Sequence, residues 1–597
     1  MATTFGQILV NDLLPKDLQT DQAINKKSLH EKLYTLARRD PATAGKTMDN
    51  IRQLGHEIAT MEGASVTLDD ITPDYKARNA ALRPALGEIQ KTGDPVKRQQ
   101  IILNAQSRLE RTLPRFGGSQ GMMVNAGARG KPVQLMRSFM APVAGRNPEG
   151  GAYPWLVHHS YSEGLRPSES WATGMESRNN LIAANLAITE PGDFSKILVN
   201  NMGDQMVLRE DCGTTNGITM ATDDTNIVDR YLAKSAAGFR AGSEITSQVY
   251  TQLRKKAKSV IVRSPMTCEL NDGVCQKCYG SNETGKLHTL GTNVGIRSAQ
   301  ALTEPLTQFT LSARHGVRQA SGDTAKIKGL KGLRQFMSIP ETFTNRAVLS
   351  ETAGKVTKIE KAPQGGHNIR VGETIHYAPP NTPPAVSMGQ TLTAGDTLTT
   401  GIPRPDDVVK HKGMGAGRKY MVDRIYDTYR DQGVDIDKRH VELLARSQLN
   451  HVQIDDDPEN HFYPGEVVSY PTLLKALAKD TTTQPLKKAG GNMLAQGYLH
   501  HVAGTIVTPE IQKELAKAGV KSVQTAKQPP AISFIMNSFV SNPLMNPNWL
   551  ARMGHRNLKT TVLEGAHFAE KAELHGTHPI PGFVHGTDFG RGSGGKY

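Results

Sequence analysis

Three of the chain's four cysteines lie in one short segment, RSPMTCELNDGVCQKCYG at residues 263–280. Cys275 and Cys278 form a C-x-x-C turn, and Cys268 precedes Cys275 by seven residues. Because such a turn points two thiolates at one place, it supplies half of a tetrahedral metal site. Cys212, in EDCGTTNG, is the cysteine left to complete the set. The cysteines therefore predict a closed, structural four-thiolate zinc site that joins two stretches of chain.

Two other interpretations of these cysteines stay open. The first is a cluster of three with Cys212 as an ordinary core residue. The second is a redox C-x-x-C, which would need a neighbouring βαβ pattern that the sequence does not show. Neither interpretation uses all four cysteines in one site.

Size and charge narrow the classes of protein to consider. The chain has 597 residues, more than one hydrophobic core supports, so several packed modules are expected. Its net charge of +14 indicates either a solvated basic surface or contact with a polyanion such as nucleic acid. No apolar run of about 18 residues is present, and the N-terminus lacks a secretory pattern. We therefore expect a cytoplasmic protein whose thiols stay reduced.

Hydrophobic periodicity predicts helical and β-rich regions in turn. The periodicity predicts long, paired helices over residues 1–115 and one long helix over residues 168–189. Residues 345–402 alternate short Val/Ile/Thr runs with glycine turns, which is typical of strands. Residues 418–451 favour two helices separated at Gly433. The expected fold class is α+β with several modules.

An internal similarity relates residues 241–264 to residues 503–527. Both stretches begin with Ala-Gly, continue to a β-branched residue and Thr, and reach Lys-Ser-Val after apolar positions four apart. The pattern predicts a strand, an amphipathic helix capped by Thr246 or Thr508, and a second strand. Two copies are too few for a solenoid.

The segment EPLTQFTLSARHGV at 304–317 combines a helical pattern with polar side chains. Gln308, Leu311 and His315 are spaced to share one helical face. Arg314 and a following glycine suit a segment that closes over an anionic substrate and excludes water. The plain alternative is an ordinary surface histidine.

Two further stretches suggest contact with nucleic acid. Residues 116–150 are glycine-rich and basic, so Arg129 is a candidate to face phosphate in a loop, unless the stretch is only a flexible linker. In the 168–189 helix, small and amide side chains such as Ala184 and Asn185 would leave room for a planar partner. The alternative is a plain amphipathic helix.

A colinear series of motifs resembles the C-terminal half of the β′ subunit of multisubunit RNA polymerase. The resemblance covers about residues 115–590, with 168–200 similar to the bridge helix and 303–340 similar to the trigger loop. The motifs, in order, are NAGARGKPVQL, YSEGL, DCGT, VRSPMTC, GVCQKCYG, VGIRSAQALTEPLTQFT, KGLRQF, SMGQTLTAGDTLTTG, FYPGEVVSY and HPIPGFVHGTDFG. The four cysteines correspond one for one to the family's second zinc site.

The resemblance implies a set of modules along the chain. They are a helical rim region at 1–115, a basic loop and bridge helix at 116–204, a jaw-like module with the four-cysteine zinc site at 205–285, a trigger loop at 286–340, a β-rich module with a small barrel- or sandwich-like sheet at 341–415, and a C-terminal α+β clamp or anchor module at 416–597.

The resemblance also implies roles in nucleotide addition. Leu311 would pack on the incoming base, Gln308 would approach its ribose and His315 would reach the β-phosphate. Ser312 stands where bacterial enzymes carry a phosphate-facing Arg, and Arg314 stands where the family has Phe. Arg314 is therefore a candidate to replace the missing cation.

Contacts to template and backbone are implied in the same way. Arg178 keeps the Arg of the bridge helix, while Ala184 and Asn185 stand where the family's Thr-Ala faces the template base. Arg129 and its loop would hold nucleic-acid backbone, so binding should weaken steeply with salt.

One expected motif is missing from this sequence. The family's catalytic Asp triad lies in a NADFDGD-type sequence, and no such sequence occurs here. We therefore expect the Mg²⁺ ions of an assembled enzyme to be held by a separate β′ N-terminal-like chain, as in the split RNA polymerases of giant bacteriophages. Other expected partners are β-like chains, a specificity subunit if one is used, DNA template, RNA and nucleoside triphosphates. The expected location is the cytoplasm of an infected bacterium, with packaging in the virion left open.

Two competing functions remain at this stage. One is a non-catalytic, zinc-containing nucleic-acid-binding protein. The other is an autonomous nucleotidyl transferase.

Overall fold

A computed structural model describes most of the chain. The described residues are 4–63, 67–111, 118–146, 152–185, 189–312, 329–431, 433–459, 461–478, 480–546, 549–553, 555 and 558–569. The chain divides into two compact units, each treated by itself below: unit 1 is Met1–Ile188, Glu283–Gly285 and Thr310–Ser321, and unit 2 is Thr189–Asn282, Lys286–Phe309 and Gly322–Tyr597.

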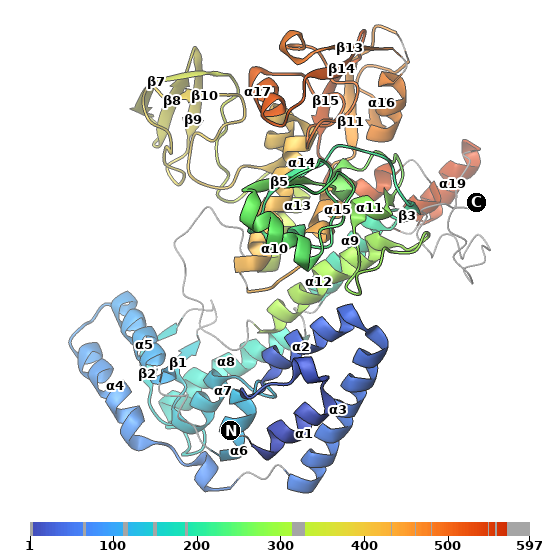
Figure 1. Ribbon diagram of the computed structural model, residues 1–597. Coiled ribbons are helices and arrows are strands. Elements are labelled where there is room, and N and C mark those ends of the chain that lie inside the picture. The colour runs from blue at the N-terminus through green and yellow to red at the C-terminus, as the bar shows by residue number, and fades with distance from the viewer. Residues whose placement is uncertain are drawn as a thin grey trace. The chain divides into compact units, whose positions relative to one another are not determined.

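Unit 1 begins with paired helices, as the periodicity predicts (Figure 1). They are α1 (Phe5–Leu13), α2 (Lys26–Arg39), α3 (Pro41–Glu62), α4 (Tyr75–Gln90) and α5 (Pro95–Glu110). The starts follow from local sequence: Asn25 caps α2, and Asp40 caps α3 ahead of Pro41. Leu82 of α4 and Ile102 of α5 are fully buried in the core that these two helices share.

The rest of unit 1 is more helical than the loop expected over 116–150. It contains α6 (Gly118–Asn125), α7 (Pro132–Leu135), a π-helical turn at Met136–Met140, the antiparallel strands β1 (Val143–Arg146) and β2 (Ala152–Val157), and α8 (Pro167–Asn185). Met136, Phe139 and Met140 are buried, and burying these three side chains favours a helical turn over an open loop.

The long helix predicted over 168–189 starts one residue early and is described in two parts. Pro167 takes the first helical position, so Ser168 lies inside the first turn and does not cap it. Instead the Glu169 carboxylate accepts the N–H of Arg166 at 3.0 Å, which is half of a capping box. α8 ends at Asn185 and α9 begins at Thr189, and the residues between them lie outside the described chain.

Unit 2 holds the remaining elements. They are α9 (Thr189–Met202), β3 (Val207–Arg209), β4 (Ile218–Ala221), α10 (Ser247–Lys256), β5 (Ser259–Val262), β6 (Val274–Cys275), α11 (Gln276–Tyr279), α12 (Val294–Ser312, as far as Phe309), α13 (Gly329–Ser338), β7 (Gly354–Lys361), β8 (His367–Val371), β9 (Thr374–Ala378), β10 (Thr391–Leu392), α14 (Pro405–Asp431), α15 (Lys438–Gln448), β11 (His451–Asp456), β12 (Val467–Ser469), α16 (Tyr470–Leu477), β13 (Thr481–Pro485), α17 (Pro509–Lys517), β14 (Ser522–Ala526), β15 (Ala531–Ile535), α18 (Trp549–Met553) and α19 (Leu558–His567).

One large core joins most helices of unit 2. α9, α12, α13, α14 and α15 all bury apolar side chains in it. The predicted pair of C-terminal helices is confirmed as α14 and α15, with Gly433 between them at a φ of 74°. α14 is itself kinked at Gly413, whose φ of 83° is not helical.

The all-β region predicted over 345–402 is confirmed as a four-stranded antiparallel sheet of order β10-β7-β8-β9. Its inward side chains form a small core of their own, with Ile369 and Val371 fully buried. Among the described residues, no helix is both long and apolar enough to cross a membrane.

The internal similarity corresponds to two copies of one local structure, both in unit 2. Thr246 caps α10 and Thr508 caps α17, and each helix leads into the predicted second strand, β5 or β14. The predicted first strand is reduced to isolated bridges, Tyr231 with Glu244 and Met493 with Ile506. The chain that leads into the first copy touches the second, since the Lys234 ammonium donates to the Ala518 carbonyl at 2.7 Å.

Candidate functional site

The four cysteines converge within unit 2 although they come from distant segments. Strand β3, which precedes Cys212, pairs in parallel with β6, which carries Cys275. Cys278 follows in α11, and Cys268 ends the 3₁₀ turn at Pro265–Thr267. The four sulfurs all lie within 4.8 Å of one another.

The sulfur spacing fits a tetrahedral metal. In a tetrahedron the edge is about 1.63 times the metal–sulfur distance, or about 3.8 Å for the ~2.3 Å bond typical of zinc. The sulfurs of Cys212 and Cys278 are 3.7 Å apart. The N–H of Cys275 points at the Cys268 sulfur (3.4 Å), and that of Cys278 points at the Cys275 sulfur (3.3 Å). Such bonds stabilise negative charge on sulfur, which suits thiolate ligands.

Two glycines, one on each side of the C-x-x-C turn, make that turn possible. Gly273 has a φ of 64° and Gly280 a φ of 92°. A Cβ on Gly280 would lie 2.4 Å from an Arg439 nitrogen, and one on Gly273 would lie 2.3 Å from the Met206 carbonyl. Glycine is therefore required at both positions.

A buried arginine faces the cluster. The Arg263 guanidinium is 3.1 Å from the Cys212 sulfur, 3.4 Å from that of Cys275 and 3.2 Å from that of Cys278. Arg263 is 3% exposed, so its charge is weakly screened. Its other nitrogen donates to Asp211 at 2.7 Å. Burial favours a raised pKa for Asp211, but bonds from Lys277 and Arg263 outweigh it and hold the pKa at about 2. A cation against the sulfurs offsets the charge that four thiolates bring.

Helix α15 holds the cysteine segment from the other side. It presents Arg439, Glu442 and Arg446, all buried and spaced along one face. Arg439 donates to the carbonyls of Tyr279 and Ser281, Glu442 accepts from Arg230 and Ser264, and Arg446 donates to the carbonyls of Pro265 and Cys268. The three side chains thus fix both ends of the cysteine segment.

The predicted moving segment falls at the end of α12. Gln308 and Leu311 lie on this helix, but their side chains are outside the described part of the chain. Arg314 and His315 lie outside the described residues altogether. The returning KGLRQF segment forms α13, with Leu333 buried.

Helix α9 is bonded to both helices that flank that segment. The hydroxyls of Ser195 in α9 and Thr303 in α12 are 3.2 Å apart. Asp193 of α9 accepts from Arg334 of α13 at 2.8 Å. These side chains are part of unit 2, and they place α9 beside α12 and α13.

The candidate nucleic-acid contacts belong to unit 1. Arg178 is exposed on α8, and Arg129 is exposed in the turn between α6 and α7. Ala184 and Asn185 end α8, and their side chains are outside the described part. Both described arginines are therefore open to solvent, as contact with a backbone phosphate requires.

Sequence reasoning missed the side chains that support the cysteines. Arg263 was visible as part of VRSPMTC, but no local pattern shows that a guanidinium turns toward sulfur. Arg439, Glu442 and Arg446 are separated from the cysteines by more than 150 residues of chain, as in the 178-residue span from Arg446 to Cys268. Their periodic spacing on one helix face was the available signal.

Comparison with known proteins gives a consistent match. The profile of the family described as RNA polymerase Rpb1, domain 5, matches residues 164–365 and 381–463. A DNA-directed RNA polymerase subunit beta' from Kocuria rhizophila is 30% identical over 531 residues, covering 79% of this chain and 40% of the relative. The same subunit from Clavibacter sepedonicus is 29% identical over 517 residues (78% and 39%), and that from Symbiobacterium thermophilum is 29% identical over 519 residues (78% and 43%). The chain thus spans about two fifths of the length of these relatives.

Proposed function

We propose that the chain is a β′-like subunit of a multisubunit DNA-dependent RNA polymerase and corresponds to a C-terminal part of the β′ subunits that it resembles. It adds nucleotides only within a complex. Its own contribution is the moving and positioning parts of the site.

The observation that carries this proposal is the position of α9. Through Ser195 and Asp193 it is bonded to Thr303 of α12 and to Arg334 of α13. The end of α12 and the whole of α13 belong to the 303–340 segment that resembles the trigger loop, and α9 lies in the stretch that resembles the bridge helix. A helix fixed to both arms of a closing segment can couple closure to movement along a template.

The chemistry assigned to this chain is positioning. Phosphoryl transfer depends on alignment and on stabilising charge as it moves between oxygens. Gln308 contacts the ribose and Leu311 packs on the base of the incoming nucleotide. His315 donates a proton or a positive charge at the β-phosphate, and Arg314 adds a second cation nearby.

Nucleic acid is held by the bridge-like helices and the basic turn. Arg178 and Arg129 contact backbone phosphate. Ala184 and Asn185 leave room for the template base to approach α8. The exposure of both arginines supports this assignment.

The four cysteines hold one structural zinc ion. The sulfur spacing and the facing Arg263 support this set, Cys212, Cys268, Cys275 and Cys278. When bound, the ion supplies a rigid tetrahedral cross-link with no open position. The chain's own residues then fix the segment against α15.

The catalytic magnesium ions belong to a partner chain in this proposal. The stretch that this chain shares with β′ subunits holds no NADFDGD-type sequence, so the proposal assigns the magnesium ions to the β′ N-terminal-like part that carries this motif, and it counts β-like chains among the partners. The setting of an infected bacterium follows from the resemblance to split phage enzymes.

The proposal is tested by reconstitution with a matched pair of variants. The chain is combined with co-purified partner chains, a primed DNA scaffold, nucleotides and magnesium, and nucleotide addition is timed. Arg334→Ala, which releases α13 from Asp193, should slow addition while leaving scaffold binding in place. The control variant Arg370→Ala, which changes an exposed arginine of β8, should bind the scaffold and add nucleotides at the wild-type rate. Equal rates for both variants would remove α9 from the mechanism.

The same assay distinguishes the polymerase subunit from the non-catalytic alternative. A zinc-containing nucleic-acid-binding protein would bind the scaffold and never support addition with any partner.

A further inference from the structure

The second copy of the repeated structure (503–527) and the turn just before it carry a group of side chains that the polymerase assignment does not use. His500 and His501 lie in the turn that begins at Tyr498, and Glu514 lies one helix later on α17. Tyr498 and His501 close the turn with paired backbone bonds of 2.9 and 3.0 Å. The hydrogen-bonded turn and α17 thus set the backbone positions of the three residues.

The donor atoms converge on one point. The Nε2 of His501 is 3.0 Å from one Glu514 oxygen, and the Nδ1 of His500 is 3.5 Å from the other. The three ligand atoms lie within 4.8 Å of one another. Around a tetrahedral ion with nitrogen and oxygen at about 2.0–2.1 Å, neighbouring donors are about 3.3 Å apart. The two nitrogen–oxygen distances, each to a different Glu514 oxygen, lie on either side of that value.

The first copy shows that the scaffold does not depend on these side chains. The turn just before the first copy, Ala236 to Phe239, has the same paired backbone bonds, and Ala237 has a φ of 51° where Leu499 has 56°. Three residues of the first copy and the turn before it match the donors: Gly238 matches His500, Phe239 matches His501 and Gln252 matches Glu514. The same backbone therefore folds with no metal-type donor at all, so the trio is not explained by folding alone.

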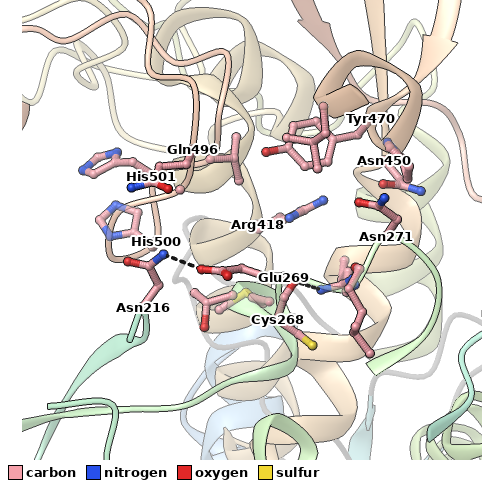
Figure 2. Close-up of a pocket in the computed structure, with 18 of the residues that line it drawn as sticks. Asn216, Cys268, Glu269, Asn271, Arg418, Asn450, Tyr470, Gln496, His500 and His501 are labelled. Carbon is pink, nitrogen blue, oxygen red and sulfur yellow. Dashed lines mark hydrogen bonds between the residues drawn. The ribbon is translucent and has the colours of Figure 1, made fainter. Parts of the chain in front are cut away.

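The two histidines are buried, whereas the glutamate is open to solvent. The side chains of His500 and His501 are 13% and 7% exposed, whereas Glu514 is 43% exposed. Figure 2 shows both imidazoles on one side of a pocket, across from Asn271 and Asn450. The pocket has a volume of about 360 Å³ and is lined mainly by α16, the turn and the segment around Cys268. A bound ion could complete its shell with water or a pocket ligand.

One nearby charge opposes a cation here. Lys419 is exposed on α14 and is close enough to act electrostatically on His500 and Glu514. Its ammonium competes for the carboxylate, so removing it should favour an ion.

We propose that His500, His501 and Glu514 form a second metal site, which takes a borderline divalent transition-metal ion such as Zn²⁺. Two imidazoles and one carboxylate are a donor set that suits zinc and its neighbours. The site is separate from the four cysteines, and it does not depend on the polymerase assignment.

The test counts metal on the full chain. Protein stripped of metal is titrated with Co²⁺ and Zn²⁺, and retained metal is measured after dialysis. Wild-type chain should hold two equivalents. The second Co²⁺ equivalent should add weak visible absorption with no thiolate charge-transfer band, because its donors are nitrogen and oxygen. A single equivalent that disappears on cysteine substitution would overturn the proposal.

Two matched variants locate the second equivalent. Glu514→Gln keeps the shape of the side chain and should weaken the second equivalent by at least tenfold, since loss of even an outer partner costs about 10–100-fold in affinity. Glu510→Gln, an exposed glutamate on the same helix, should change nothing. Lys419→Met should tighten the second equivalent. Unchanged binding in Glu514→Gln, with folding verified by circular dichroism, would exclude this site.

Discussion

Arg230 and Glu442 form a two-bond ion pair inside unit 2: one guanidinium nitrogen donates at 2.8 Å and the other at 2.7 Å, and the side chains are 1% and 0% exposed. The pair connects the chain between Cys212 and Cys268 to α15. Ser264 also donates to the same carboxylate at 2.7 Å. Because both charges are withdrawn from water, each depends on the other for solvation.

Breaking that pair should destabilise unit 2. Glu442→Gln leaves a buried guanidinium without its carboxylate, and we expect a loss of about 3–5 kcal/mol in the free energy of unfolding. The change is measured as a fall in the denaturation midpoint of unit 2. Asp407→Asn removes a partly exposed pair with Arg346 and should cost about 1 kcal/mol or less. Similar losses for both variants would contradict the role given to burial.

Arg263 should control how firmly the cysteine cluster holds the proposed zinc ion. Arg263→Ala removes the positive charge that faces three sulfurs, and zinc should become about 10–100-fold easier to extract. Competition with a chelator that changes colour on binding zinc measures the loss. Arg240→Ala, an exposed arginine in the same region, is the control and should match wild type. Equal extraction from both variants would remove Arg263 from the site.

Acid should loosen unit 1 through Glu163. Burial alone would raise the pKa of this carboxyl. Hydrogen bonds from Arg78 and Ser160 outweigh burial and lower the pKa from its ordinary value of 4.5 to about 2. The pKa is lower in the folded state, so the stabilisation is fully present above pH 4.5 and is lost as the pH falls toward 2. The shift corresponds to stability on the order of 3 kcal/mol.

The measurement is the thermal midpoint of unit 1 between pH 5 and pH 2. Glu163→Gln should be less stable than wild type at neutral pH, and the difference should shrink as the medium is acidified. A constant difference across that range would show that the carboxyl charge is not what stabilises the contact.

The helices and the cysteine cluster were predictable from sequence because local signals specify them. Caps such as Asp40 and Thr508, and the short spacing of Cys275 and Cys278, act within a few residues. Arg263 and Glu442 were not predictable in their roles, because their partners are set by packing between distant segments.

His315 should matter only in the assembled enzyme. His315→Ala is expected to slow nucleotide addition by about 10²–10⁴-fold if the side chain transfers a proton. Solvent deuterium isotope effects on the single-turnover rate distinguish the roles, since a proton donor transfers its proton in the transition state and a positional cation does not. His367→Ala, in β8 of the small sheet, is the control. An unchanged rate for His315→Ala would show that the trigger-loop assignment is wrong.

The central claim is that this chain supplies positioning elements to a magnesium site held on another polypeptide. Nucleotide incorporation on a primed scaffold tests it most directly, first with the purified chain and magnesium, then after adding a partner that bears the Asp triad. We predict no extension with the chain alone and extension with the partner present. Magnesium-dependent extension by the chain alone would contradict the claim.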